Sequence, residues 1–183
     1  GMHIMIRDGT TARNLKSLLP LINPYNSRRC SFCTDDRNPE DLLTEGHINY
    51  IVKTAIKEGL DPVMAIQIAT INTARYFGLY HLGAVAPGYY ADLVVFDNFR
   101  DFNIKQVYQK GQKVAEDGKF LGKLPDVKKR PLRSTVNVKW LDIKDFLIPM
   151  SKDFSGNCGR VIGIIPDQII TRNLVEKLSV SNG

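Results

Sequence analysis

Short apolar runs and helix-spaced apolar residues alternate over the first 80 positions of the chain. The runs at 3–6 and 30–34 predict strands, and the second is flanked by polar residues, which is typical of a buried strand. Between them, four apolar residues recur at the spacing of one helix face: Leu15, Leu18, Leu19 and Ile22. The chain is therefore predicted to begin as a strand, a helix and a second strand.

Helical signals follow the second strand. A helix is expected to start at Asn38, because Pro39 and two acidic residues occupy the first turn. A longer helix is predicted from His47 to Gly59, another from Asp61 to about position 68, and a last one over 73–77.

Beyond Gly83 the pattern changes to short strands and tight turns. A compact apolar run at 91–96 predicts a strand, and the runs 107–109 and 113–115 flank a hairpin turn. Further strand patterns follow at 136–140 (where Val136, Val138 and Trp140 alternate with polar residues), 159–166 and 168–171.

This order predicts a fold of class α/β plus β, in which strand–helix units come first and a small β region follows. It is the order expected for the C-terminal portion of a (β/α) barrel joined to an accessory β-rich subdomain. A complete barrel needs about 250 residues, and the chain has 183.

Composition places the chain among ordinary globular proteins. Apolar residues make up 43% and the formal charge is +6, so the signature of a disordered chain is absent. No apolar run approaches the length of about 18 residues that predicts a membrane span, and no signal peptide is recognised at the N-terminus. We therefore expect a cytoplasmic protein without a membrane partner.

The cysteines and the basic residues add two expectations. The three cysteines are Cys30, Cys33 and Cys158, and an odd count favours a reducing compartment. Cys30 and Cys33 are three apart on a predicted strand and so face opposite sides, which argues against a shared zinc ion.

The basic stretch 122–134 is interpreted as a solvated linker. Nucleic-acid binding is the alternative, which the lack of interleaved aromatic residues disfavours.

The candidate chemistry begins with Asp35 and Asp36, directly after the predicted buried strand. Barrel enzymes carry catalytic residues at the C-terminal ends of their strands, where an aspartate can bind a divalent metal and accept a proton. The alternative is structural: Asp35 caps the following helix and Asp36 points to solvent.

Glu45 and His47 form a second candidate group, separated by one glycine. The His47 imidazole could hydrogen-bond a substrate or a ligand, and the alternative is that His47 simply begins a helix. His3 and His81 lack the spacing of a metal-binding motif.

These segments resemble a known family. Residues 31–39 and 45–48 resemble the adenine deaminases of the amidohydrolase superfamily, as do residues 6–15. The stretches 61–74 and 82–95 are similar to a signature of the wider superfamily, and residues 160–171 are similar to the C-terminal extension of the adenine deaminases.

The resemblance implies hydrolysis of adenine to hypoxanthine and ammonia by a metal-activated hydroxide that attacks C6. It implies a binuclear divalent metal centre (manganese or iron, with zinc as the alternative) that this chain does not retain by itself. By match to the family pattern, Asp35 is a metal ligand and proton shuttle. Asp36 is a candidate for contact with the base or for orienting the ligands, and Arg7, Glu45 and His47 are candidates for the pocket or its supporting shell.

The chain also departs from the family pattern, because the family's early HxH pair, bridging carboxylate and later histidine ligands are not found in it. We therefore expect a piece of an adenine deaminase that is inactive without an N-terminal part and forms homo-oligomers.

The expected domains are 1–80 (barrel), 81–121 (accessory subdomain), 122–134 (linker) and 135–183 (start of a C-terminal domain). The alternatives are a catalytically silent assembly module and another cyclic amidohydrolase, such as a dihydroorotase-like enzyme.

Overall fold

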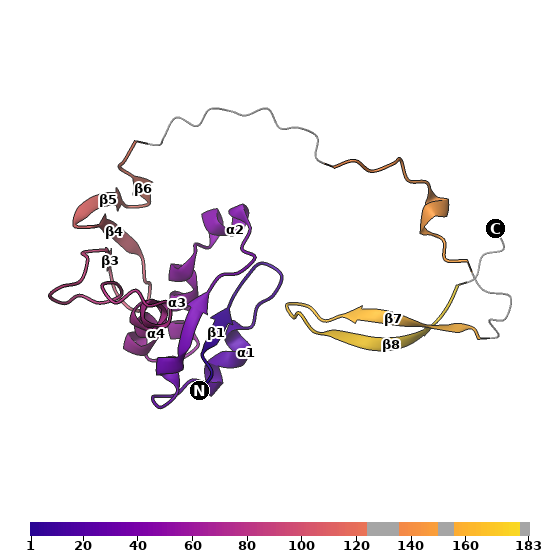
Figure 1. Cartoon of the computed structure of the whole chain (residues 1–183), viewed down its shortest axis with the longest axis horizontal. Coiled ribbons are helices and arrows are strands. Elements are labelled where there is room, and N and C mark those ends of the chain that lie inside the picture. The colour runs from indigo at the N-terminus through magenta and orange to yellow at the C-terminus, as the bar shows by residue number, and fades with distance from the viewer. Residues whose placement is uncertain (124–135, 150–155, 180–183) are drawn as a thin grey trace. The chain divides into compact units, whose positions relative to one another are not determined.

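The computed structural model of the chain describes residues 1–123, 136–149 and 156–179 (Figure 1). The chain divides into two units, one formed by Gly1–Gly122 with Ile164–Thr171 and the other by Lys123–Gly163 with Arg172–Gly183. Among the described residues, no helix is both long enough and apolar enough to cross a membrane.

The first unit is built on a parallel pair of strands, β1 (Ile4–Arg7) and β2 (Cys30–Cys33). Ile6 and Phe32 are opposite each other in the register and both are buried, which confirms the two predicted strands. The connection between them contains α1 (Leu15–Leu18) and two 3-10 helices at Leu19–Leu21 and Ser27–Arg29.

The helix predicted from Leu15 to Ile22 is α-helical for only one turn. Pro20 lies in the first turn of the 3-10 helix that follows. Because proline has no N–H to donate to the preceding turn, the α-helix cannot continue through it. The buried positions Leu15 and Leu19 are nevertheless kept on one face.

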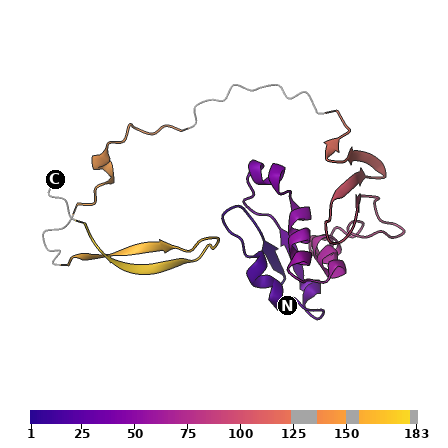
Figure 2. The ribbon, with the colours of Figure 1, turned by 180° about the vertical axis from the view of Figure 1, so that it is seen from behind.

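Four helices follow β2: α2 (Pro39–Thr44), α3 (Ile48–Lys57), α4 (Pro62–Ala69) and α5 (Ile71–Tyr76). The Asp61 carboxylate accepts a hydrogen bond of 2.8 Å from the backbone N–H of Met64 and so caps α4. Helices α3, α4 and α5 pack against β2, as the views from the front and from behind show (Figures 1 and 2).

One apolar core holds these elements together. Its buried members are Ile6, Leu15, Leu19, Cys30, Phe32, Ile51, Val52, Ala55, Ala65, Ile68 and Phe102. They come from both strands, from α1 and the 3-10 helix at Leu19–Leu21, from α3 and α4, and from the loop that precedes β4. The core thus fixes the strand ends relative to the helices that follow.

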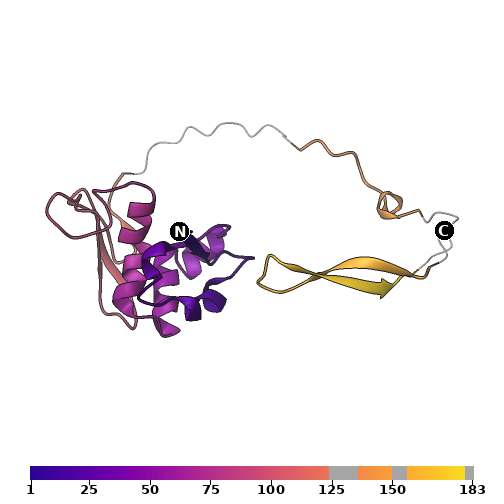
Figure 3. The ribbon, with the colours of Figure 1, turned by 60° about the horizontal axis from the view of Figure 1, so that its bottom comes forward.

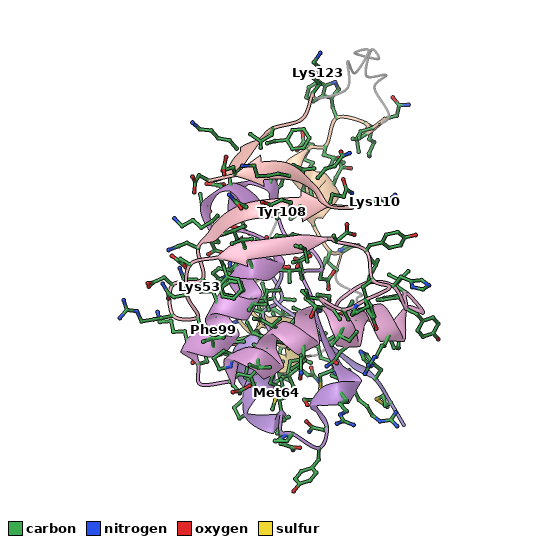
Figure 4. All side chains as sticks on the ribbon, turned by 90° about the vertical axis from the view of Figure 1, so that its left-hand side faces the viewer. Lys53, Met64, Phe99, Tyr108, Lys110 and Lys123 are labelled. Carbon is green, nitrogen blue, oxygen red and sulfur yellow. The ribbon has the colours of Figure 1, made fainter. Side chains whose placement is uncertain are left out.

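An antiparallel sheet in the order β3-β4-β5-β6 completes the first unit. It consists of β3 (Leu93–Phe96), β4 (Ile104–Gln109), β5 (Gln112–Glu116) and β6 (Lys119–Phe120), and it lies beside the helices (Figure 3). Lys110 and Gly111 join β4 to β5 with φ angles of 49° and 79°. Positive φ at both positions is the type I′ geometry, so the predicted hairpin is confirmed. Figure 4 shows Tyr108 on β4, and Lys110 in this turn.

Most of a further strand pair, β7 (Cys158–Ile164) and β8 (Thr171–Lys177), and a 3-10 helix at Ile143–Phe146 are the regular elements described in the second unit, whereas Ile164–Thr171 are assigned to the first. The strand predicted at 159–166 is confirmed up to position 164, whereas the one predicted at 168–171 is wrong up to position 170. Residues 165–168 form a turn there, in which the Gln168 N–H donates to the Ile165 carbonyl at 3.2 Å.

The half-buried strand predicted at 136–140 is also wrong. Residues 136–142 have no regular structure and Trp140 is fully exposed. Alternation alone does not make a strand, because a strand needs a hydrogen-bonded neighbour, and no described residue pairs with this segment. Residues 124–134 of the predicted linker lie outside the described residues. The mixed α/β character of the chain is confirmed.

Candidate active site

The candidate site lies where the two parallel strands end. Arg7 and Cys33 are partners in the register, so the chain leaves β1 and β2 at the same edge of the pair. Asp35, two residues after β2, has a φ of 58°. Aspartate and asparagine tolerate this left-handed conformation better than most residues. The turn brings the Asp35 carboxylate to the Arg7 guanidinium, and the two form an ion pair.

Asp36 points back toward the loop that follows β1. Its carboxylate accepts a hydrogen bond from the Thr11 hydroxyl and another, at 3.2 Å, from the Thr11 backbone N–H. The hydrogen bond from the Thr11 side chain is the main reason that the pKa of Asp36 is lowered. A side chain at Gly9 would collide with the Asp36 carboxylate, so this approach requires glycine.

The capping alternative for Asp35 is therefore wrong, whereas Asp36 is exposed to solvent as its alternative predicted, with its carboxylate held by Thr11. The residue at the N-terminus of α2 is Asn38, and Asp35 does not cap that helix. Instead, Asp35 is bound to Arg7 and Asp36 to Thr11. Both contacts connect the end of β2 to the end of β1 and its loop.

A second connection between the same loops involves Thr10. Its hydroxyl donates to the Asp41 carboxylate in α2 and accepts a hydrogen bond of 2.9 Å from the Asn38 backbone N–H. The loop after β1 is thus held at Thr10 and at Thr11 by the segment that follows β2.

His47 lies at the same edge. It is the residue before the first turn of α3, as the structural interpretation predicted, but its side chain does not cap the helix. The imidazole Nε2 is 3.3 Å from the Thr34 hydroxyl, one residue before Asp35. His47 therefore combines the helix start with a side chain that faces the end of β2.

Arg37 contacts both loops of this arrangement, although the sequence analysis assigned it no role beyond its place in the motif. Its side chain is only 1% exposed and forms an ion pair with Glu45. Its Nε donates to the Gly46 carbonyl at 2.9 Å and its Nη1 to the Asp8 carbonyl at 3.3 Å. Glu45 is thus the counter-ion of a buried arginine.

Asp8 is a second group that the sequence analysis missed. It directly follows β1 and is 5% exposed. Burial raises the pKa of its carboxyl, and the nearby Arg13 and Arg37 partly offset this effect. Its position next to Arg7, at the end of a predicted strand, was the available signal.

Residues 4–114 match the amidohydrolase family. The chain belongs to this family. Among its relatives, the adenine deaminase of Desulfatibacillum aliphaticivorans is 48% identical over 183 residues, which are 100% of this chain and 31% of that protein. The adenine deaminase of Thermosipho melanesiensis is 57% identical over 127 residues, which are 69% of this chain and 22% of that protein.

This amidohydrolase chain therefore resembles adenine deaminases as its motifs indicated, and it spans about 31% of the length of relatives that it matches from end to end. A crystal structure of an amidohydrolase from Thermotoga maritima MSB8 is similar over 46% of this chain and 23% of that chain. The sequence identity is 27% and the TM-score is 0.38.

Amidohydrolases generally use divalent metals. The described residues contain no group of three or more His, Cys, Asp or Glu side chains that could hold a metal ion. Asp35 offers one carboxylate, whereas divalent cations in proteins take about four or more ligands. The described residues alone therefore bring together fewer candidate ligands than a divalent cation takes.

Proposed function

We propose that this chain forms one side of the active site of an adenine deaminase, which hydrolyses adenine to hypoxanthine and ammonia. The observation that carries the proposal is the 48% identity, over the whole chain, with a relative that bears this name. The grouping of Arg7, Asp35 and His47 at one strand edge supports it, because catalytic residues of barrel enzymes gather at such an edge.

In this proposal residues 1–80 are the last strand and helix units of a (β/α) barrel. Residues 81–121 are the accessory subdomain, and 135–183 begin a further domain. The parallel pairing of β1 and β2, with helices following β2 and a separate antiparallel sheet after them, is consistent with this assignment.

Asp35 is the residue to which we assign both metal binding and proton transfer. The chemistry that a divalent metal (manganese or iron, with zinc as the alternative) supplies when bound is a water activated for attack at neutral pH. In the overall reaction, water adds oxygen at C6 of adenine and the amino group leaves as ammonia. The Asp35 carboxylate would accept a proton from the attacking water and return it to the departing nitrogen.

The other candidates act around Asp35. The Arg7 guanidinium forms an ion pair with the Asp35 carboxylate and so orients the group that would accept a proton or bind a metal. Asp36, through Thr11, holds the loop that follows Arg7 and so orients the site. Glu45 acts through Arg37, and His47 beside Thr34 is the candidate for contact with the base.

A chimera tests the proposal. The matching segment of the Desulfatibacillum aliphaticivorans adenine deaminase is replaced by this chain, and ammonia release from adenine is measured with Mn²⁺ or Fe²⁺. We expect release, and we expect Asp35→Asn to lower the rate at least ~100-fold, because the ligand and proton carrier are lost. The matched control is Asp117→Asn, since Asp117 also has a positive φ, of 43°, but lies in the turn between β5 and β6.

The same experiment separates the alternatives. A folded chimera that releases no ammonia from adenine but hydrolyses dihydroorotate would favour another cyclic amidohydrolase. A folded chimera without either activity would favour the silent assembly module. Equal rates for Asp35→Asn and the unmodified chimera would refute the role of Asp35. The isolated chain is expected to be inactive, because its described residues provide too few ligands for a metal centre.

A further inference from the structure

We propose that Arg37 is a positioning residue, which fixes the turn 45–47 and thereby holds the His47 imidazole beside Thr34. The proposal concerns how the chain places His47, and only the relevance of that placement to catalysis rests on the proposed function.

Arg37 carries a buried positive charge. The guanidinium group of Arg37 is removed from water, and a buried charge is tolerated only when it is paired and hydrogen-bonded. Arg37 meets this condition through an ion pair, two bonds to backbone carbonyls and one aromatic ring. It has the Glu45 carboxylate, the carbonyls of Gly46 and Asp8, and the Tyr50 ring, whose centroid is 4.4 Å from its Cζ.

These partners belong to three different parts of the site. Asp8 follows β1, Glu45 and Gly46 lie between α2 and α3, and Tyr50 is in the first turn of α3. Arg37 itself follows β2. One side chain thus joins the ends of both strands to the start of the helix that His47 precedes.

The connection to His47 runs through a single peptide unit. The carbonyl of Gly46 accepts the bond from Arg37 Nε, and the N–H of His47 donates to Asn49 Oδ1 at 2.8 Å. Because the peptide group is planar, holding its oxygen on one side and its N–H on the other fixes its orientation. The Cα of His47 is therefore placed by Arg37 and Asn49 together.

Gly46 makes this turn possible. Its φ is 111°, and a side chain built there would come within 2.8 Å of the Asn49 amide. The N–H groups of Glu45 and Gly46 also donate to the Asp41 carbonyl, at 2.9 and 3.1 Å, so α2 holds the start of the turn and Arg37 holds the Gly46 carbonyl.

Lysine cannot replace Arg37 in this role. A guanidinium offers donors in a planar fork and stacks on an aromatic ring, whereas an ammonium is a compact charge on a flexible stem. An Arg37→Lys variant keeps the positive charge next to Glu45 but loses the geometry that binds Gly46, Asp8 and the Tyr50 face at once. We therefore expect Arg37→Lys to release the turn.

The chain contains only three histidines, His3, His47 and His81, which permits a direct measurement. The full chain is labelled with ¹⁵N-histidine, and its imidazole signals are recorded at one fixed pH without metal or adenine. A His47→Gln variant identifies the His47 signals. In Arg37→Lys we expect the His47 signals to move or broaden while those of His3 and His81 keep their positions.

The matched control is Arg100→Lys, at an arginine whose side chain is 90% exposed. It should leave all three histidines unchanged. A folded Arg37→Lys chain with unmoved His47 signals would overturn the proposal. This measurement needs no turnover, so its outcome is independent of whether the chain deaminates adenine.

If Arg37→Lys moves the imidazole signals of all three histidines, the whole fold is affected. A less disruptive variant then tests the proposal. Glu45→Gln removes the charge of one Arg37 partner at a side chain that is 31% exposed. We expect it to move the His47 signals in the same direction as in Arg37→Lys, and by less, with His3 and His81 unmoved. Unmoved His47 signals in Glu45→Gln would then count against the proposal.

Discussion

Arg7 and Asp35 lie at the ends of neighbouring parallel strands and form an ion pair across the edge where both strands stop. The side chains are partly exposed, at 26% and 38%. The pair therefore joins two groups that water can still reach. We infer that the Arg7–Asp35 pair positions a charged carboxylate at this edge and adds little to the stability of the fold.

The energy of this pair is expected to be small. A double-mutant cycle with Arg7→Met and Asp35→Asn should give a coupling of about 0.2–1 kcal/mol in the free energy of unfolding. The coupling should shrink when the salt concentration is raised from 0.1 to 1 M, since exposed charges are screened. Urea unfolding followed by circular dichroism measures it. A larger, salt-independent coupling would indicate a site closed to water.

Asp36 is expected to make the fold sensitive to acid. Its pKa is lowered in the folded chain by the hydrogen bond from the Thr11 side chain, so its contribution to stability is complete above the ordinary value of 3.8. The contribution is lost as the pH falls from 3.8 through the lowered folded value. Asp36→Asn should therefore flatten the fall of the unfolding free energy in this window.

Thr11→Val is the matching change on the other side of this contact, and it should flatten the same part of the curve. The comparison is a series of urea unfolding curves between pH 5 and pH 2. Parallel curves for the unmodified chain and both variants would mean that the contact between Asp36 and Thr11 does not form in solution.

The strand pair β1–β2 is expected to drive self-association of the isolated chain. Parallel sheets are normally covered on both faces, yet Ile4 and Met5 are 48% and 41% exposed. We expect oligomers in size-exclusion chromatography with light scattering, and we expect Met5→Lys to shift them toward monomers. Leu43→Lys in α2, at an 88% exposed position, should leave the distribution unchanged. A monomer at all concentrations would contradict this prediction.

Phe32 should be among the most sensitive core positions. It is 3% exposed and belongs to β2, which packs against α3 and α4 in the same core. Phe32→Ala should cost about 3–5 kcal/mol of unfolding free energy, since it removes apolar contacts and leaves a cavity. Phe120→Ala, at a 58% exposed position, is the control and should cost far less. Equal losses of unfolding free energy in the two variants would mean that Phe32 is not a core residue.

Local pattern was sufficient for most elements of the first unit. The apolar run at 30–34 predicted β2, and the pair Lys110-Gly111 predicted the β4–β5 hairpin, because each signal depends on residues close in sequence. The helix after Leu15 was predicted too long, since a single proline outweighed the apolar spacing. The strand predicted at 136–140 is wrong because a strand needs a hydrogen-bonded partner, which alternation within one segment does not reveal and which no described residue supplies.

The contrast between local signals and contacts of distant segments also decided which site residues the sequence could predict. Asp35 and His47 were found because they stand at recognisable ends of predicted elements. Arg37 was missed because its four partners come from segments up to 29 positions away, so its burial appears only when the chain is folded. Asp36 and Thr11, 25 positions apart, were likewise invisible as a pair.

Trp140, the single tryptophan of the chain, is fully exposed and stands in a segment without regular structure. Its indole is already surrounded by water before denaturation. Tryptophan emission should therefore scarcely change in wavelength when the chain unfolds. The seven tyrosines and the far-ultraviolet circular dichroism are the signals that can follow loss of the helices and strands.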